Sequence, residues 1–362
     1  MVLAIRVCAC ALVALALSAV VVKPVAAATF VYVSMGGDSA LAVFEQNAAD
    51  GSLLLRHRLT LAGKPGPLAI GPSKRFIYAA IRPQGSVVTL AIDPQSGEPK
   101  QIASAAVAAD PVYLATDRQE RFLFAAYYGA GTAVVYPIAS DGAVDGEPTS
   151  IVMTDKNPHS IMVDPTNRYV YVPNTGADKV MQFHFDSQEG RLTPNMPGAL
   201  RTGVMTGPRH FCFHPTLPKV YFVNEKGNSV SVCDWNRDDG TLTVQQTIST
   251  LPDEFDGRTN TAHIEVTPSG KYLYASNRGH DSLAMFAIDP TTGALTSLGQ
   301  QPTEATPRSF TIDPSGQFLH AAGQASGRLA SYRIDETNGR LKPLATYELG
   351  TGPAWVLAVT LE

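Results

Sequence analysis

Cysteine, charge and the common catalytic motifs are all scarce in this 362-residue sequence. It has four cysteines, 17% charged residues and a net charge of −4. Without a basic surplus there is no general electrostatic field for nucleic acid. No CxxC pair or Cys/His cluster suggests zinc, and there is no GxSxG, HExxH, P-loop or calcium-loop pattern. These absences argue against serine-elbow, zinc-peptidase and nucleotide-dependent chemistry, although ligands from distant parts of the chain could still gather around a metal.

The cysteines also argue against a disulfide. Cys8 and Cys10 lie near the N-terminus, and Cys212 and Cys233 fall on the predicted first and third strands of one meander. Strands that are next but one to each other lie about twice the 4.8 Å strand spacing apart. That separation exceeds the ~7 Å limit for a disulfide, so we expect two buried thiols.

Residues 1–28 differ from the remainder in composition. Arg6 precedes an apolar run from Val7 to Val22, and Ala26-Ala27-Ala28 forms an A-x-A site before Thr29. This pattern predicts a secretory signal peptide; the alternative is a retained membrane anchor, but the run is shorter than the ~20 residues of a span. We therefore expect residues 29–362 as one exported domain, periplasmic or secreted, without a membrane span after cleavage. Its net charge would be −6.

Three markers recur seven times each along this domain. They are a proline or its equivalent before a predicted first strand, an aromatic residue or histidine in a second strand, and a glycine in the turn between third and fourth strands. Their positions are Pro65, Pro111, Pro158, Pro208, Thr261, Pro307 and Pro353; Tyr32, Tyr78, Phe124, Tyr171, Tyr221, Tyr274 and His320; and Gly51, Gly97, Gly142, Gly190, Gly240, Gly293 and Gly339. Each series advances by an average of 48 residues.

A period of this length built from four short strands predicts a β-propeller. Seven markers predict an all-β ring of seven four-stranded antiparallel blades. The phase is offset, because the domain starts on a second strand at Phe30–Val33 and ends on a first strand at Trp355–Val359. The C-terminal strand should therefore join the N-terminal blade and leave no open sheet edge. Two steps are longer than the others, and we place the additions in Thr193–Thr206 and Ser249–Thr261, between blades.

In a meander, alternate connections share a face, so the entry to strand one and the loop after strand two lie together. On this face we expect His159, Arg209, Glu225 and Arg278 to converge as the catalytic set, with His210, His263 and Arg308 as substrate-binding residues. Histidine suits acid–base work near neutral pH, and arginines suit a carboxylate, a phosphate or a developing oxyanion. The alternative is that the arginines are inter-blade struts and the histidine is merely solvated.

Several segments resemble the seven-bladed lactonases, a family that includes propeller 6-phosphogluconolactonases and carboxymuconate cyclases. They are Gly207-Pro208-Arg209-His210 with Phe213-His214-Pro215, Val223-Asn224-Glu225, Ser276–Ser282 (SNRGHDS), and Pro307–Phe310 with Ile312–Gly316. The resemblance implies the same catalytic set, His159, Arg209, Glu225 and Arg278. It does not decide between hydrolysis and lactonisation, because both kinds of member share the scaffold.

The resulting hypothesis is a lactone hydrolase that acts on a small anionic sugar-acid lactone, in which His159 activates water. It implies no cofactor and no metal. One alternative is a non-catalytic binding or scaffold propeller of the cell envelope, and another is a muconate-type lactonising cycloisomerase. A third alternative, a metal-dependent lactonase, would need a metal ion in the central funnel, the opening at the ring axis on this face. We also expect the insertion Leu251–Asn260 to form either a partial lid over the funnel or an ordinary long loop.

Overall fold

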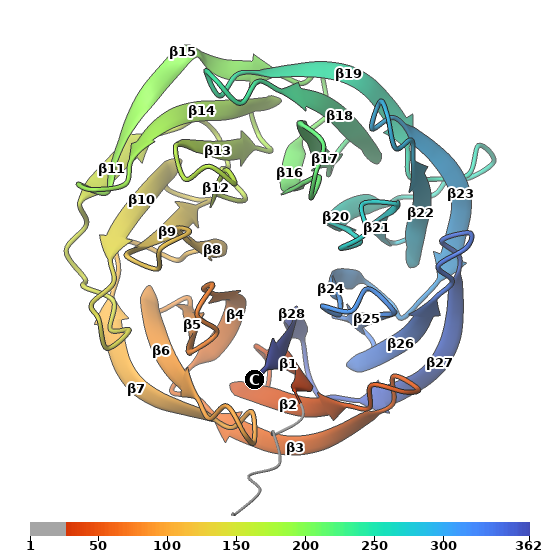
Figure 1. Cartoon of the computed structure of the whole chain (residues 1–362), viewed down its shortest axis with the longest axis horizontal. Helices are drawn as coiled ribbons and strands as arrows, with labels where there is room; N and C mark the ends of the chain where they lie inside the picture. The colour runs from red at the N-terminus through yellow and green to blue at the C-terminus, as the bar shows by residue number, and fades with distance from the viewer. Residues whose placement is uncertain (1–26) are drawn as a thin grey trace, which may run out of the picture.

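The computed structural model describes residues 27–362, which form seven four-stranded antiparallel sheets arranged radially around one axis (Figure 1). The chain is therefore a seven-bladed β-propeller, as the three markers predict. No α-helix occurs between residues 27 and 362. The predicted signal peptide lies almost entirely outside the described residues.

Each blade contains four strands, named below in order from the axis outward. Blade 1 holds β28 (Pro353–Leu361), β1 (Ala28–Met35), β2 (Ala40–Gln46) and β3 (Leu53–Thr60); blade 2 holds β4 (Lys64–Ile70), β5 (Phe76–Arg82), β6 (Ser86–Ile92) and β7 (Pro99–Ala106). Blade 3 holds β8 (Tyr113–Thr116), β9 (Phe122–Tyr127), β10 (Thr132–Pro137) and β11 (Ser150–Met153); blade 4 holds β12 (Met162–Val163), β13 (Tyr169–Asn174), β14 (Lys179–Asp186) and β15 (Arg191–Arg201). Blade 5 holds β16 (Pro208–Phe213), β17 (Lys219–Asn224), β18 (Ser229–Trp235) and β19 (Leu242–Ser249); blade 6 holds β20 (Asn260–Val266), β21 (Tyr272–Arg278), β22 (Ser282–Ile288) and β23 (Leu295–Pro302). Blade 7 holds β24 (Pro307–Ile312), β25 (Phe318–Gly323), β26 (Arg328–Ile334) and β27 (Leu341–Glu348).

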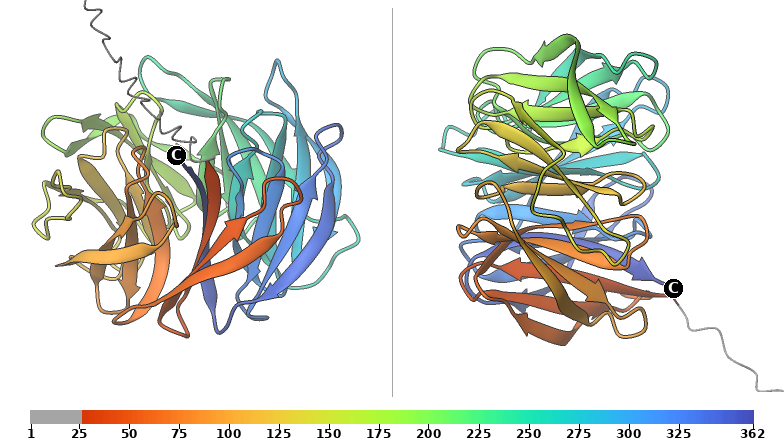
Figure 2. Two further views of the ribbon diagram at one scale, coloured as in Figure 1. Left: turned by 60° about the horizontal axis from the view of Figure 1, so that its bottom comes forward. Right: turned by 90° about the vertical axis from the view of Figure 1, so that its left-hand side faces the viewer.

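The two ends of the chain close the ring within blade 1. Strand β28 pairs antiparallel with β1, from Ala28 opposite Leu361 to Met35 opposite Pro353. The predicted closure is thus confirmed, and the strand is longer than the segment Trp355–Val359. Seen edge-on in Figure 2, the ring is a thick disc with the C-terminus at one of its two faces. We call this the lower face, and the face where the inner strands begin the upper face.

Two of the three sequence markers contact each other across the blade interfaces. In four cases the second-strand tyrosine donates a buried hydrogen bond from its hydroxyl to the carbonyl of the turn glycine in the next blade. The pairs are Tyr32 with Gly97 (2.7 Å), Tyr171 with Gly240 (2.7 Å), Tyr221 with Gly293 (2.9 Å) and Tyr274 with Gly339 (2.8 Å). The glycine backbone has positive φ, between 65° and 87° at all seven turn markers, which disfavours a side chain there.

The remaining blades substitute other groups for this bond. In blade 3 the second strand carries Phe124 in place of tyrosine, and Thr149 donates instead to the carbonyl of Gly190 in blade 4. Thr89 donates to Gly142, which leaves the hydroxyl of Tyr78 buried without a partner in the described chain. His320 instead bonds to Gln46 of blade 1 at 2.7 Å. The markers therefore recur because they build the contacts between neighbouring sheets.

Burial is highest in the middle of each blade. The second and third strands are mostly buried, the first strands mix buried and half-buried residues along the channel, and the outermost strands are mostly half-buried or exposed. The hydrophobic clusters lie between adjacent sheets; one joins Phe30 and Leu41 of blade 1 to Ile77 and Leu90 of blade 2. Burying each such side chain contributes roughly 1.5–3 kcal/mol.

Two details differ from the sequence-based expectation. The first addition does not form an inter-blade loop but lengthens β15, which bulges opposite Met181 and Phe183; the second is the connection between β19 and β20. The two thiols are free, as expected, but only Cys233 is fully buried, whereas Cys212 is partly exposed.

Candidate functional site

The inner strands begin on the upper face with an irregular step. In blade 5, Pro208 pairs with Asn224 but Phe211 pairs with Phe222, so three steps along β16 match two along β17. Blades 1, 2, 6 and 7 carry a similar irregularity at the same point. In a regular strand, Arg209 and His210 would point to opposite faces. The bulge lets both line the central cavity.

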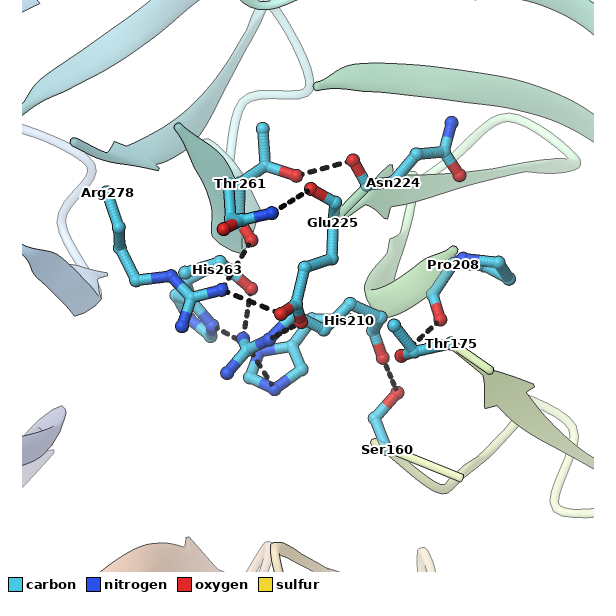
Figure 3. A network of polar contacts seen from close by, with 12 residues as sticks. Ser160, Thr175, Pro208, His210, Asn224, Glu225, Thr261, His263 and Arg278 are labelled. Carbon is cyan, nitrogen blue, oxygen red and sulfur yellow. Dashed lines mark hydrogen bonds and ion pairs between the residues drawn. The ribbon is translucent and has the colours of Figure 1, made fainter. Parts of the chain in front are cut away.

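Glu225 joins two arginines from neighbouring blades (Figure 3). It follows β17 directly, and its Oε2 lies 2.9 Å from Nε of Arg209 while its Oε1 lies 3.0 Å from Nη2 of Arg278. The Arg209 side chain is 1% exposed and the Glu225 side chain 23% exposed. Since Glu225 is shared, two guanidinium groups meet one carboxylate.

Arg209 is held by further contacts from its own blade and the next. Its Nη1 donates to the backbone carbonyl of Ala262 and, at 3.1 Å, to Nε2 of His210. Nε lies 2.9 Å from Oε2 of Glu225 as an ion pair without hydrogen-bond geometry, and Nη2 has no hydrogen-bond partner among residues 27–362. Burial, followed by the nearby Arg308 and Arg278, lowers the pKa of Arg209, and Glu225 opposes that shift.

Two more arginines lie at the same mouth. Arg82 forms a bidentate pair with Asp110, at 2.6 and 2.7 Å. Arg308 has no carboxylate partner within the described part of the chain, and burial, then Arg278 and Arg82, lower its pKa to about 10. Four guanidinium groups thus face two carboxylates, which leaves a local charge of +2 on an acidic protein. Such a site attracts an anion.

His159 lies beside this cluster in blade 4. It is 6% exposed, its ring is edge-on to Tyr128 and to His210, and its Nδ1 has no hydrogen-bond partner from residues 27–362. Burial, then Arg209 and Arg308, lower its pKa well below 6.5. The imidazole is therefore neutral at pH 7 and can accept a proton.

Four aromatic rings form a septum across the central channel. They are Trp355, Tyr113, His210 and His263, with Trp355 centroids 5.3, 5.6 and 5.7 Å from the other three, respectively. A polar chain crosses the septum, because Nδ1 of His210 lies 2.8 Å from Nδ1 of His263, and Nε2 of His263 lies 3.2 Å from Oε1 of Glu265.

The septum divides the channel into two cavities. The upper one, about 20 Å³, is lined by His159, Arg209 and Arg308 and, from the septum, by His210 and Trp355, and it reaches about 300 Å³ when its solvent-open mouth is included. The lower one is about 570 Å³ and is largely apolar, with Glu265 and His263 at its wall. We assign the candidate site to the upper mouth despite its smaller volume, because the unpaired cationic and neutral basic groups converge there.

The structure brings together most of the predicted site. His159, Arg209, His210 and Arg308 line the upper cavity, and Glu225 and Arg278 adjoin it through their ion pairs. His263 does not line this cavity; it faces the lower one behind Trp355. The sequence analysis expects it among the substrate-binding residues of the upper face, whereas its side chain lies in the septum and lines the lower cavity.

Four residues of this region were not foreseen: Asp110, Tyr113, Trp355 and Glu265. Tyr113 and Trp355 lie two residues after their proline markers, the same position as His210 and His263 after theirs. The aromatic residues at this shared position of the repeat are the sequence signal that could have predicted the septum. The loop Leu251–Asn260 contributes no residue to the lining of the upper cavity, and its Phe255 packs edge-on against His280 at 4.6 Å.

Within residues 27–362, no group of three or more His, Cys, Asp or Glu side chains could hold a metal ion. In the same range, no helix is long and apolar enough to cross a membrane.

Comparison with known proteins agrees with this fold. The family model described as "Lactonase, 7-bladed beta-propeller" matches residues 15–102 and 56–358. A 6-phosphogluconolactonase of Pectobacterium carotovorum is 37% identical over 317 residues, covering 88% of this chain and 95% of the relative. One from Serratia proteamaculans is 36% identical over 326 residues, covering 90% and 97%.

Among solved structures, the periplasmic gluconolactonase of Pseudomonas aeruginosa superposes with a TM-score of 0.86. It is 25% identical in sequence, and the match covers 92% of this chain and all of that one. Since the matches span nearly the whole length of both partners, they concern the complete ring and not one blade.

Proposed function

The chain belongs to the seven-bladed β-propeller lactonase family, and we propose that it hydrolyses the lactone ring of a sugar acid or a related anion at the upper mouth. The observation that carries the proposal is the convergence of Arg209, Arg278 and Arg308 with one shared carboxylate beside a neutral histidine. The names of the relatives, 6-phosphogluconolactonase and gluconolactonase, support a sugar-acid lactone.

In this proposal the arginines bind the charge of the substrate and the charge that develops during reaction. A carboxylate or phosphate would bind the Arg308 guanidinium, which has no carboxylate partner among residues 27–362, and the Nη2 edge of Arg209. Each charge-assisted hydrogen bond contributes roughly 1.5–3 kcal/mol. The lactone carbonyl oxygen becomes negative when water adds to it, so a second guanidinium, Arg278, would stabilise the tetrahedral intermediate.

His159 would act as the general base. Its neutral imidazole takes a proton from water as the water oxygen bonds to the lactone carbonyl carbon. The ring C–O bond then breaks, and the departing ring oxygen takes the proton from the His159 imidazolium to become a hydroxyl, which returns His159 to its neutral form. The product is an open hydroxy acid. Glu225, between Arg209 and Arg278, would hold both guanidinium groups in place.

The small enclosed volume favours a second candidate, a propeller that binds an anion without turnover. A cavity of about 20 Å³ holds roughly one water. This enclosed volume is far below the roughly 300–1,000 Å³ of small-molecule sites. Catalysis therefore requires the substrate to bind in the mouth, with its reacting carbon above His159.

We also propose that residues 1–28 are a signal peptide that exports the domain. The periplasmic gluconolactonase of Pseudomonas aeruginosa shows that an exported protein can have this fold. Cleavage would leave Thr29 as the first residue, at the start of β1. N-terminal sequencing of protein from a periplasmic fraction tests this; an intact Met1 on cytoplasmic protein would refute it.

A pH-stat assay of the purified protein on a panel of lactones tests the activity. The panel should pair anionic with neutral sugar lactones, each corrected for spontaneous opening. We expect acid release with the anionic members and its loss in His159→Ala. A panel without turnover, combined with phosphate binding by calorimetry, would favour the binding protein.

A further inference from the structure

The polar chain across the septum has only one consistent direction. An arginine donates hydrogen bonds and never accepts them, whereas an ionised carboxylate only accepts them. Nη1 of Arg209 must therefore donate to Nε2 of His210 (3.1 Å), which places the proton of His210 on Nδ1. That Nδ1–H donates to Nδ1 of His263 (2.8 Å), so His263 carries its proton on Nε2 and donates to Oε1 of Glu265 (3.2 Å).

This ordering requires both histidines to be neutral, each in one tautomer. A second proton on either ring would bring two N–H donors together at the 2.8 Å contact or against Arg209. Burial, followed by Arg209 and His263, lowers the pKa of His210 well below 6.5, in agreement with the neutral form. The arginine at one end of this hydrogen-bond chain and the carboxylate at the other therefore require the same tautomers of His210 and His263.

Glu265 is unusual at its level in the ring. The seven residues that lie four positions after the proline markers are Ala69, Ala115, Met162, Cys212, Glu265, Thr311 and Leu357. One of these seven is charged. A carboxylate among such neighbours costs free energy unless it is hydrogen-bonded. Its Oε2 accepts the backbone N–H of Ile312 in blade 7 at 2.7 Å, which leaves Oε1 for His263.

We propose that Glu265 is a positioning residue for the upper site: through His263 it fixes the tautomer of His210, and so directs the Arg209 guanidinium. With Nη1 bonded to Ala262 and His210, and Nε facing Glu225, Arg209 presents Nη2 to an anion. The inference rests on the proposed function for the anion's role in catalysis. The hydrogen-bond direction itself follows from the geometry.

The variant Glu265→Gln tests this with an exchange of one oxygen for an NH₂ group. Only the amide oxygen can accept the Ile312 N–H, so the NH₂ faces Nε2 of His263 and donates to it. His263 must then carry its proton on Nδ1, and His210 on Nε2. His210 Nε2–H would meet Arg209 Nη1–H, donor against donor, on the far side of the septum.

The direct measurement is the tautomer of each ring in the full chain with ¹⁵N-labelled histidine, by long-range ¹H–¹⁵N correlation. The parent should show His210 protonated at Nδ1 and His263 at Nε2, and Glu265→Gln should reverse both. Calorimetry with inorganic phosphate should show affinity reduced roughly five- to tenfold, part of the ten- to hundredfold that a charge-assisted hydrogen bond is worth. The control is Lys74→Gln. Lys74 lines the same lower cavity but takes no part in the hydrogen bonds from Arg209 to Glu265, so this variant should change neither result.

Other tautomers in the parent would overturn the inference, and this outcome does not depend on the variant folding. If Glu265→Gln kept the tautomers of the parent and lost only thermal stability, the role of Glu265 would be limited to accepting the hydrogen bond from the Ile312 N–H. A parent with the stated tautomers but no lactone turnover would remove the proposed function and leave the inference standing. Lactone turnover with the wrong tautomers would do the opposite.

Discussion

The hydroxyl of Tyr171 in blade 4 donates a 2.7 Å hydrogen bond to the carbonyl of Gly240 in blade 5. Both residues are sequence markers, 69 residues apart. The contact explains why an aromatic residue and a turn glycine recur together, since each repeat bonds to the next and not to itself.

Removing that hydroxyl should weaken the ring by a measurable amount. Tyr171→Phe leaves a buried carbonyl without its donor, and we expect a loss of about 1 kcal/mol in the free energy of unfolding. Tyr78→Phe is the matched control, because its hydroxyl is buried with no partner among residues 27–362; it should be neutral or stabilising. Equal losses in the free energy of unfolding of the two variants, measured by urea denaturation, would show that the Tyr171–Gly240 hydrogen bond does not stabilise the ring.

Deleting residues 355–362 should destabilise the whole protein. The deletion removes most of β28, the inner strand of blade 1, and exposes the edge of β1 along the register from Ala28 to Ser34. An open ring edge loses its backbone pairing and invites aggregation. Differential scanning calorimetry should show a lower melting temperature for the entire transition; an unchanged transition would mean that closure contributes nothing.

The arginines predict selectivity for anionic substrates. Arg278→Ala leaves Glu225 with one partner and removes positive charge from the mouth, so kcat/KM for an anionic lactone should fall about ten- to a hundredfold. Arg278→Lys should not restore it fully, because the planar fork is lost. Arg56→Ala, on an exposed surface pair, is the control. High salt should weaken the parent's preference for anionic over neutral lactones. Equal turnover of both kinds would identify the arginines as struts.

His159 predicts a pH profile for the reaction. Because burial and the arginines lower its pKa, the free enzyme keeps the neutral base at pH values where an ordinary histidine is protonated. The acid limb of kcat/KM should therefore lie below pH 6.5. His159→Ala should lower kcat more than it raises KM and abolish this limb. A limb at or above pH 6.5 that survives the substitution would exclude His159 as the base.

His320 predicts acid sensitivity of the fold. Burial lowers its pKa from 6.5 to about 4, since Ser331 and Gln46 enclose the neutral ring. The unfolded chain binds a proton below about pH 6.5, whereas the folded chain resists it until about pH 4. The contribution of neutral His320 to the free energy of unfolding is therefore fully present above pH 6.5. It falls by on the order of 3 kcal/mol as the pH drops from 6.5 to about 4.

The variant His320→Phe separates this effect from the other buried histidines. His159 and His210 also have lowered pKa values and contribute to acid sensitivity in both proteins. The difference in stability between parent and variant should therefore narrow as the pH falls from about 7 to about 4 in urea denaturation. A constant difference would show that His320 titrates normally.

The sequence by itself determined the seven blades, their phase and the closing strand. These follow from local chemistry repeated at a fixed period: turn glycines with positive φ, buried aromatic residues and strand-start prolines. It also indicated which face carries His159, Arg209, Glu225 and Arg278, because alternate loops of a meander must share a face. The extension of β15 was missed, since an outer strand can lengthen without changing the markers.

Only the tertiary structure decided how the central channel is divided into two cavities. One extra residue at the start of an inner strand turns two consecutive side chains toward the axis, and no sequence period reports such a bulge. Both His210 and His263 follow such a bulge, yet His210 lines the upper cavity and His263 lines the lower one. The link from Glu265 to Arg209 joins residues of two blades across a septum to which Trp355, from a third, also contributes. Their contact depends on the curvature of the closed ring, which brings the inner strands together.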